Sequence, residues 1–356
     1  MLKVLFTYDY ELFLGKNNSS AEEILFKPTE LVAGAMLNQG ARGVFFADVC
    51  SAIRHRDVGL LDYSEQFDNQ IQELTKNGHD VQLHLHTNWY ASERQGDTLE
   101  VSPKGYKIHE FGFDQDTALS VPKIIAATKL YLEECCSAVQ PEYRCIAYRA
   151  GGFGVQPEAE LFNALLEAGI VIDSSVNPHL YSLDTVNSFD FRNVPKALNW
   201  RIDPEQGISV AALEGIWEIP VATARLRPLE MIGRSTADFK LPSVALKGEY
   251  VKTEGVSKAQ EAKWKRLLKR ILGYRNLSLD TRTYTAIFSD LEYLYKKYNL
   301  HKKDAYVCLI CHPKLIDQVR IDNISRLIEE LGKYPKKYKI VTCMDIYQEL
   351  IEGKLL

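Results

Sequence analysis

The sequence predicts an α/β barrel, in which parallel strands alternate with helices. Short β-rich apolar runs alternate along the chain with segments of helical periodicity. The alternation recurs seven or eight times, which favours closure of the sheet into a barrel over an open sheet. A length of 356 residues fits either one such barrel or two domains, so the prediction depends on the alternation.

Each predicted element has a local basis in the sequence. Strands are expected at residues 2–8, 43–47, 81–86, 145–148, 170–173, 216–221, 306–311 and 339–342. Helices are expected at residues 22–37, 64–76, 114–136, 157–168, 284–298 and 321–331. Gly40, Gly78 and Gly169 follow the ends of three of these helices and Pro157 begins one, which is where helices favour these residues.

One segment breaks the alternation. Residues 225–280 carry no strand signal and are expected to form a helical basic insertion within a single domain that spans residues 1–356. The stretch 258–275 is rich in Lys and Arg and has apolar residues near helical spacing. It is therefore expected either to dock its apolar face on the barrel or to make peripheral contact with an anionic membrane surface.

Composition and charge exclude several classes of protein. The chain has 43 Lys and Arg residues against 47 Asp and Glu residues, a net charge of -4, so a nucleic-acid partner is not expected. No apolar run approaches the roughly 18 residues of a membrane span. Because Asp9 and Glu11 interrupt the first apolar run, we expect no export signal and a cytoplasmic location, with the seven cysteines as reduced buried thiols.

Four polar side chains at the ends of two predicted strands form the first candidate site. Asp9 and Glu11 lie two residues apart, as do His84 and His86, so each pair shares one face of its strand. Two imidazoles and one carboxylate fill three positions of a zinc site and leave the fourth open, as in catalytic centres. Taken alone, the two acids would also suit a solvated turn or a helix N-cap, and a single histidine would also suit a satisfied position in the core.

Three further strand ends carry polar groups. Arg149 precedes a glycine-rich turn and is suited to hold a carboxylate such as Asp9 ionised, while the backbone amides of residues 151–153 would stabilise an oxyanion. Asp173 and His312 end two more strands. Each has an ordinary alternative as a turn cap or a surface residue, but five polar strand ends together fit the catalytic face of a barrel.

Taken in order, these motifs resemble the NodB homology domain of the polysaccharide deacetylases, carbohydrate esterase family 4. The resemblance covers residues 2–221 and resumes at 306–313; it includes 41–46, similar to the second strand of the family, and 218–221, similar to a late one. It implies a distorted (β/α)7 barrel with an insertion before the last strands. It also implies a metal-dependent carbohydrate N-deacetylase, a hydrolase of carbon–nitrogen bonds other than peptide bonds, acting in cell-surface polysaccharide biosynthesis.

The resemblance also implies roles for individual residues. Asp9 corresponds to the catalytic base and Arg149 to the arginine that pairs with it. His312 corresponds to the general acid that protonates the leaving amine, and Asp173 to the acid that tunes this histidine. Glu11 is the candidate ligand of a divalent metal, zinc in preference.

The metal motifs depart from the family pattern at two places. The adjacent pair of aspartates has become Asp9-Tyr10-Glu11, which displaces the acidic ligand by one residue. The two histidines of the family lie four residues apart, whereas this chain has Asn88 four residues after His84. His86, on the same strand face as His84, is the replacement expected here, so the predicted metal set is Glu11, His84 and His86.

The expected substrate is an N-acetylated sugar, on a nucleotide or lipid carrier in view of the basic insertion and the expected cytoplasmic location. Trp89, Tyr148 and Phe153 are expected to form an apolar floor for the sugar ring, and Gly152 to supply a backbone amide. One alternative is a catalytically inactive carbohydrate-binding protein on the same barrel. A second is a non-haem iron oxygenase, which the βα alternation disfavours. The oligomeric state is not predicted.

Overall fold

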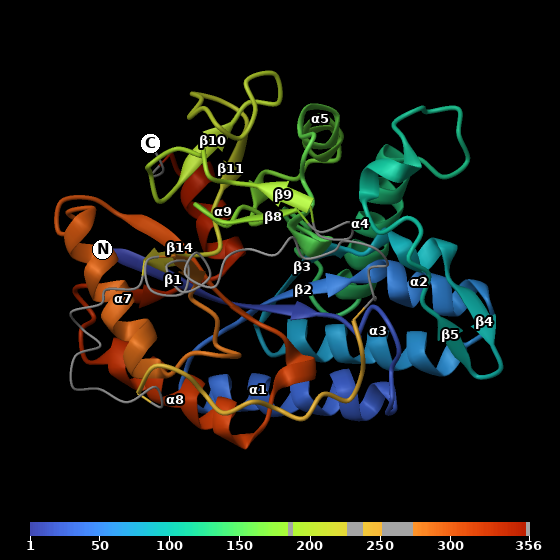
Figure 1. Ribbon diagram of the computed structural model, residues 1–356, viewed down its shortest axis with the longest axis horizontal. Coiled ribbons are helices and arrows are strands. Elements are labelled where there is room, and N and C mark those ends of the chain that lie inside the picture. Colours follow the sequence, from blue (N-terminus) through green and yellow to red (C-terminus); the bar gives the residue numbers. More distant parts are fainter. Residues whose placement is uncertain (184–187, 226–237, 251–272, 354–356) are drawn as a thin grey trace, which may run out of the picture.

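A curled, mainly parallel sheet forms the centre of the molecule (Figure 1). The computed structural model describes residues 1–183, 188–225, 238–250 and 273–353. The parallel strands, in their order across the sheet, are β11 (Ile216–Glu218), β7 (Ile172–Asp173), β6 (Ala147–Ala150), β3 (Asp80–Leu85), β2 (Val44–Asp48), β1 (Leu2–Tyr10) and β14 (Ala305–Cys311). At its edges β10 (Trp200–Ile202) pairs antiparallel with β11, and β15 (Tyr338–Ile340) pairs with the start of β1. The predicted α/β class is confirmed.

The two ends of this series of strands meet, which closes the distorted barrel. Val221, just after β11, forms a parallel bridge with Cys308 of β14. The backbone N–H of Ala222 donates to the carbonyl of Cys308 at 2.9 Å. Farther along β14, the N–H of Leu279 donates to the carbonyl of Ile310 at 2.8 Å. The carboxyl end of β14 is therefore bordered by residues that lie within the segment predicted as an insertion.

Helices surround the outside of the strands (Figure 1). They are α1 (Lys27–Asn38), α2 (Val49–Asp57), α3 (Leu61–Lys76), α4 (Val121–Ser137), α5 (Ala159–Glu167), α7 (Tyr284–Lys297), α8 (Gln318–Gly332) and α9 (Cys343–Ile351). A π-helical turn, Glu22–Phe26, precedes α1. The sequence prediction omitted α2 and α9, which are short. The start of α9 is marked by a capping box, in which Thr342 and Asp345 accept hydrogen bonds from each other's backbone N–H.

Short hairpins interrupt the alternation of strands and helices. They are β4 (Glu93–Gln95) with β5 (Thr98–Glu100), β8 (Tyr181–Leu183) with β9 (Ser188–Asp190), and β12 (Thr223–Arg225) with β13 (Tyr274–Asn276). All seven cysteines are free and every one except Cys135 is buried, as expected for reduced thiols.

Strand β1 shows how the core positions the site. Val4, Phe6 and Tyr8 pack in the larger apolar cluster with the helices, whereas Leu5 belongs to a second cluster with Val44 and Phe46 of β2. Successive side chains of a strand point to opposite faces, so the odd-numbered residues of β1 face the barrel interior. Beyond Leu5 these are Thr7 and Asp9, both buried. The interior thus changes from apolar to polar toward the carboxyl ends of the strands.

The prediction of a helical insertion at 225–280 is wrong at its end. Residues 274–276 form β13, which pairs with β12, and 277–279 pair with β14, because alternating buried residues such as Leu277 and Leu279 favour an extended chain. The described residues 238–250 contain no α-helix either. Within the basic stretch 258–275, for which membrane contact was expected, residues 258–272 lie outside the described residues. Among the described residues, no helix combines the length and apolar character required to cross a membrane.

Candidate active site

Five of the predicted catalytic and metal-binding residues meet in one cavity of about 250 Å³ at the carboxyl ends of the strands. They are Asp9, Glu11, His84, His86 and His312. They come from β1, β3 and β14 or from residues directly after these strands, and neighbouring parallel strands bring such positions together. Arg149, on β6, lies behind them and is fully buried.

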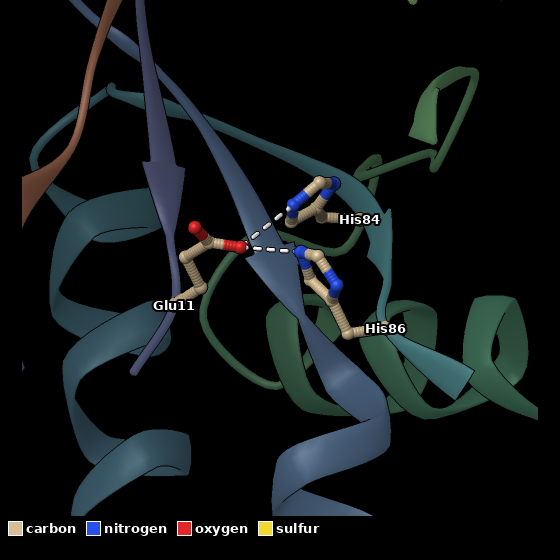
Figure 2. A group of neighbouring side chains, drawn as sticks. All are labelled: Glu11, His84 and His86. Atoms are coloured by element: carbon tan, nitrogen blue, oxygen red, sulfur yellow. Dashed lines mark hydrogen bonds and ion pairs between the residues drawn. The ribbon is translucent and has the colours of Figure 1, made fainter. Parts of the chain in front are cut away.

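Glu11, His84 and His86 form a compact, buried group (Figure 2). Oε2 of Glu11 lies 2.5 Å from Nε2 of His86 and 3.1 Å from Nε2 of His84. One ligand atom from each side chain lies within 4.8 Å of the other two. Figure 2 shows the carboxylate directed at both imidazole rings, so the spacing of two residues along β3 and its extension does place both histidines on the same face.

The surroundings of the two histidines suit metal binding. Nδ1 of His84 lies 2.8 Å from the carbonyl oxygen of Arg149, which only an N–H can satisfy, so the neutral form of the ring is the one that presents its Nε2 lone pair to the site. His86 is held by its backbone N–H, which donates to Asp48 at 3.2 Å. Two imidazole nitrogens and a carboxylate oxygen are the donors that zinc accepts in catalytic sites, so the residues present fit a divalent metal.

Gly151 permits the close packing of His86. A Cβ at this position would lie 2.7 Å from Nδ1 of His86 and 2.4 Å from the carbonyl oxygen of Leu85. Both distances are far shorter than van der Waals contact. The glycine-rich turn after β6 therefore sets the position of a candidate metal ligand, a function that the sequence pattern did not indicate.

Asp9 pairs with Arg149 in the barrel interior. The Nη1 atom of Arg149 donates to Oδ1 of Asp9 at 2.6 Å and to Oγ1 of Thr7 at 2.9 Å, and its Nε donates to the carbonyl of Ser174 at 2.9 Å. Burial alone would raise the pKa of the Asp9 carboxyl, but Arg149, with His84 and His312, outweighs it and lowers this pKa. Asp9 is thus held ionised.

His312 has a carboxylate partner that the sequence prediction missed. Its Nδ1 lies 2.7 Å from Oδ2 of Asp280, and its backbone N–H donates to Oδ1 of the same residue at 2.9 Å. Nε2 of His312 lies 3.7 Å from Oδ2 of Asp9. Burial would lower the pKa of His312, but Asp280 and Asp9 together raise it above its ordinary value.

The predicted pairing of Asp173 with His312 is wrong. Asp173 accepts hydrogen bonds from the hydroxyl of Ser175 at 2.7 Å and from its backbone N–H at 3.2 Å. Asp173 lies opposite Glu218 where β7 pairs with β11. Burial and the neighbouring charge of Asp173 raise the pKa of the Glu218 carboxyl well above its usual range. Asp173 therefore belongs to a buried acidic pair, and the barrel closure brings Asp280 to His312 instead.

Two of the four predicted substrate contacts lie inside the core. Tyr148 neighbours Arg149 on β6, so its side chain points to the opposite face and is fully buried among the outer apolar residues. Trp89 is 1% exposed and donates its indole N–H to Asp48 at 2.6 Å. Gly152 and Phe153 do line the cavity, and both have a positive φ, 57° and 61°, in the turn after β6.

Other aromatic side chains complete the cavity wall. Tyr106 lies with its ring centroid 5.8 Å from that of His86, and Phe189 packs edge to face on Phe153 at 6.0 Å. Tyr250 comes from the segment 238–250, which is fastened where the backbone N–H of Glu249 donates to the carbonyl of Lys16 at 2.7 Å. No local motif marks these residues, because they reach the cavity from separate loops.

The chain was compared with known proteins. No protein-family model matches it, and no curated protein does. Among solved structures, it is similar to a protein assigned to the polysaccharide deacetylases from Mycobacterium smegmatis, with 12% identity, a TM-score of 0.47, and coverage of 100% of this chain and 92% of that chain.

Two further solved structures are similar over most of the chain. One is a family 4 carbohydrate esterase from Streptomyces lividans in complex with acetate, with 9% identity, a TM-score of 0.36, and coverage of 96% of this chain and 92% of that chain. The other is the PuuE allantoinase, with 12% identity, a TM-score of 0.46, and coverage of 98% and 88%. Proteins of the class that the sequence motifs resemble are thus among the structures similar to this chain.

Proposed function

We propose that this protein is a metal-dependent hydrolase that removes an N-acetyl group from a sugar. The observation that carries the proposal is the meeting, in one cavity, of three parts: the cluster of Glu11, His84 and His86, the ionised Asp9, and the pair of His312 with Asp280. Hydrolysis of an amide needs an electrophilic centre, a base for the attacking water and an acid for the leaving nitrogen.

Asp9 is the base in this proposal. Its Oδ1 is held by Arg149, while Oδ2 faces His312 and the cavity. Arg149 fixes the orientation of the carboxylate and keeps it unprotonated, so that Oδ2 is ready to accept a proton from a water molecule in the cavity.

His312 is the proton donor to the leaving amine. Asp280 orients the ring through Nδ1, which leaves Nε2 directed toward Asp9 and the cavity. Because Asp280 and Asp9 raise its pKa, the protonated form of the imidazole is favoured, and this form can give the Nε2 proton to nitrogen as the carbon–nitrogen bond breaks.

Glu11, His84 and His86 would hold the divalent metal, zinc in preference. A divalent metal in such a site polarises a carbonyl oxygen and lowers the pKa of a bound water. Gly152 and Phe153 line the same cavity. We propose that their backbone N–H groups donate to the oxyanion that forms during hydrolysis.

The size and lining of the cavity support a sugar as substrate. Its volume of about 250 Å³ lies just below the range of roughly 300–1,000 Å³ that is usual for small-molecule pockets, which suits one ring with its acetamide group. Tyr106, Phe153, Phe189 and Tyr250 offer aromatic faces to the C–H bonds of such a ring. We propose a carrier-linked N-acetyl sugar of surface polysaccharide biosynthesis, with the carrier a nucleotide or a lipid.

Metal content and acetate release test the proposal together. Mass spectrometry of the purified protein should find close to one zinc per chain, and E11A, H84A and H86A should each lose it. The wild type should release acetate from N-acetylglucosamine oligomers or from a nucleotide-linked N-acetyl sugar, in a reaction that a chelator abolishes.

The variant H312Q is the matched control, because it lies outside the metal cluster. It should keep the zinc and lose most of the acetate release. A wild type that binds no metal after reconstitution would refute the hydrolase and favour the catalytically inactive carbohydrate-binding protein. Oxygen-dependent turnover with bound iron would instead favour the oxygenase.

A further inference from the structure

Lys314 is a buried cation in direct contact with the candidate metal ligand Glu11. Its ammonium donates to Oε1 of Glu11 at 2.6 Å and to the carbonyl oxygen of Leu12 at 3.1 Å. The side chain of Lys314 is 0% exposed. Its ammonium also lies 5.2 Å from the ring centroid of Phe13 and 5.1 Å from that of Tyr250.

The lysine takes one oxygen of Glu11 and leaves the other to the histidines. Oε1 accepts from Lys314, whereas Oε2 faces Nε2 of both His84 and His86. A carboxylate can bind a metal through one oxygen or two. With Oε1 held by an ammonium, Glu11 is fixed as a ligand through Oε2 alone.

The same contact changes the charge of the candidate site. Glu11 is the only anionic ligand of the proposed set, and the charge of Lys314 cancels it within hydrogen-bond distance. Burying an ammonium is costly, so a lysine that acted only by packing would be better replaced by an apolar residue. A positive charge this close to a bound dication opposes metal binding and makes the centre more electrophilic.

We propose that Lys314 is a positioning residue that restricts Glu11 to coordination through one oxygen. By cancelling the charge of Glu11, Lys314 also lowers the affinity of the site for the metal and makes the bound metal better able to polarise the substrate. This inference rests on the proposed metal site, and it assigns to the segment after His312 a function that the sequence motifs do not contain. Lys314 acts through Glu11 and does not itself touch the substrate.

The test measures zinc affinity in the variant K314Q, whose amide is polar but carries no charge. Metal-free protein is titrated with zinc against a chromophoric chelator. K314Q should bind zinc at least tenfold more tightly than the wild type. The control K333Q removes the charge of an exposed lysine on the surface and should leave the affinity unchanged. Equal or weaker binding in K314Q would overturn the proposal.

A second comparison remains decisive if K314Q alone folds poorly. In E11Q the ammonium of Lys314 has lost its carboxylate partner and should suppress zinc binding, and E11Q/K314Q should regain at least tenfold in affinity over E11Q. No gain in the double variant would overturn the proposal. If the wild type binds zinc and K314Q binds it with the same affinity, this inference is refuted and the proposed function is not. If the wild type binds no zinc, the proposed function is refuted as well.

Activity gives an additional readout. K314Q saturated with zinc should show a lower kcat for acetate release with little change in KM, and K314R, which restores the charge, should recover it. A lysine with a merely structural role would lower stability without this split between kcat and KM.

Discussion

Asp280 accepts a hydrogen bond from Nδ1 of His312 at 2.7 Å, across a separation of 32 residues. The two residues meet because 277–279 border the carboxyl half of β14, so that Asp280 comes beside the residue directly after this strand. The carboxylate of Asp280 thus holds His312 at two points, the ring Nδ1 and the backbone N–H.

The first prediction concerns the pH profile of D280N. A general acid must be protonated, so activity falls as the pH rises through the pKa of His312. Asp280 is the main group that raises this pKa, so its replacement by Asn should move the alkaline limb of the kcat/KM profile to lower pH and reduce kcat by about 10²-fold. The measurement is acetate release over a range of pH.

The matched control for D280N is D173N. Because Asp173 bonds to Ser175 and lies beside Glu218, this variant should change stability but leave the alkaline limb in place. A limb that moved in D173N and stayed in D280N would show that the assignment of His312 and its partner is mistaken.

The second prediction is that G151A weakens metal binding without touching a ligand. The new methyl group would meet Nδ1 of His86 and the carbonyl of Leu85, so the imidazole must shift away from Glu11. Zinc affinity should fall by about tenfold or more in a chelator competition assay.

Gly154 provides the control for G151A, because a Cβ there would lie 3.5 Å from the nearest atom, the carbonyl oxygen of Gly151, which is an ordinary contact. G154A should bind zinc as the wild type does. Equal loss of affinity in both variants would point to a general effect on the turn and not to displacement of His86.

The third prediction separates cavity residues from core residues. Phe153 and Tyr250 line the cavity, so F153A and Y250A should each raise KM for the N-acetyl sugar about three- to tenfold, as the loss of an aromatic contact would. Y148F should leave KM unchanged, because the phenol is fully buried on the outer face of β6. Steady-state kinetics check all three, and a raised KM in Y148F would contradict the structure.

The fourth prediction is a loss of stability in mild acid. Burial lowers the pKa of both His55 and His79 to about 4, against 6.5 in the unfolded chain. Between these two values the unfolded chain binds protons that the native protein does not, so the free energy of unfolding falls as the pH falls. Each histidine should contribute about 2 kcal/mol to this loss between pH 7 and pH 5.

Urea denaturation at the two pH values checks the contribution of each histidine. H79Q should depend less on pH than the wild type, since Gln can still accept the hydrogen bond from the backbone N–H of Gly43. H301Q replaces an exposed histidine and should behave as the wild type does. An unchanged slope in H79Q would mean that His79 is not the group that titrates.

The sequence predicted the parts of the site that depend on local strand geometry. Asp9 and Glu11 share a face of β1 and its extension, and His84 and His86 share a face of β3 and its extension, because side chains alternate along a strand. The same rule, applied to β6, would have excluded Tyr148 once Arg149 was assigned to the interior. The strands and most helices follow from local periodicity in the same way.

Residues that depend on long-range closure could not be predicted. Asp280 reaches His312 only because its segment pairs with β14, although the alternation of Leu277, Ser278 and Leu279 was a signal for an extended chain. The sequence shows that Lys314 follows His312 by two residues, but it does not show that the ammonium is buried in contact with Glu11. Burial and partner choice are properties of the folded chain.

Arg149 beside Asp9 and Lys314 beside Glu11 give each of these two buried carboxylates its own cation before any metal binds. In small zinc proteins the metal supplies the free energy of folding, and a chelator unfolds them. Here the anionic groups are already neutralised by the polypeptide, so we expect the metal-free protein to stay folded, to survive dialysis against a chelator, and to take up different divalent ions in turn. One preparation could therefore serve to rank metals by activity.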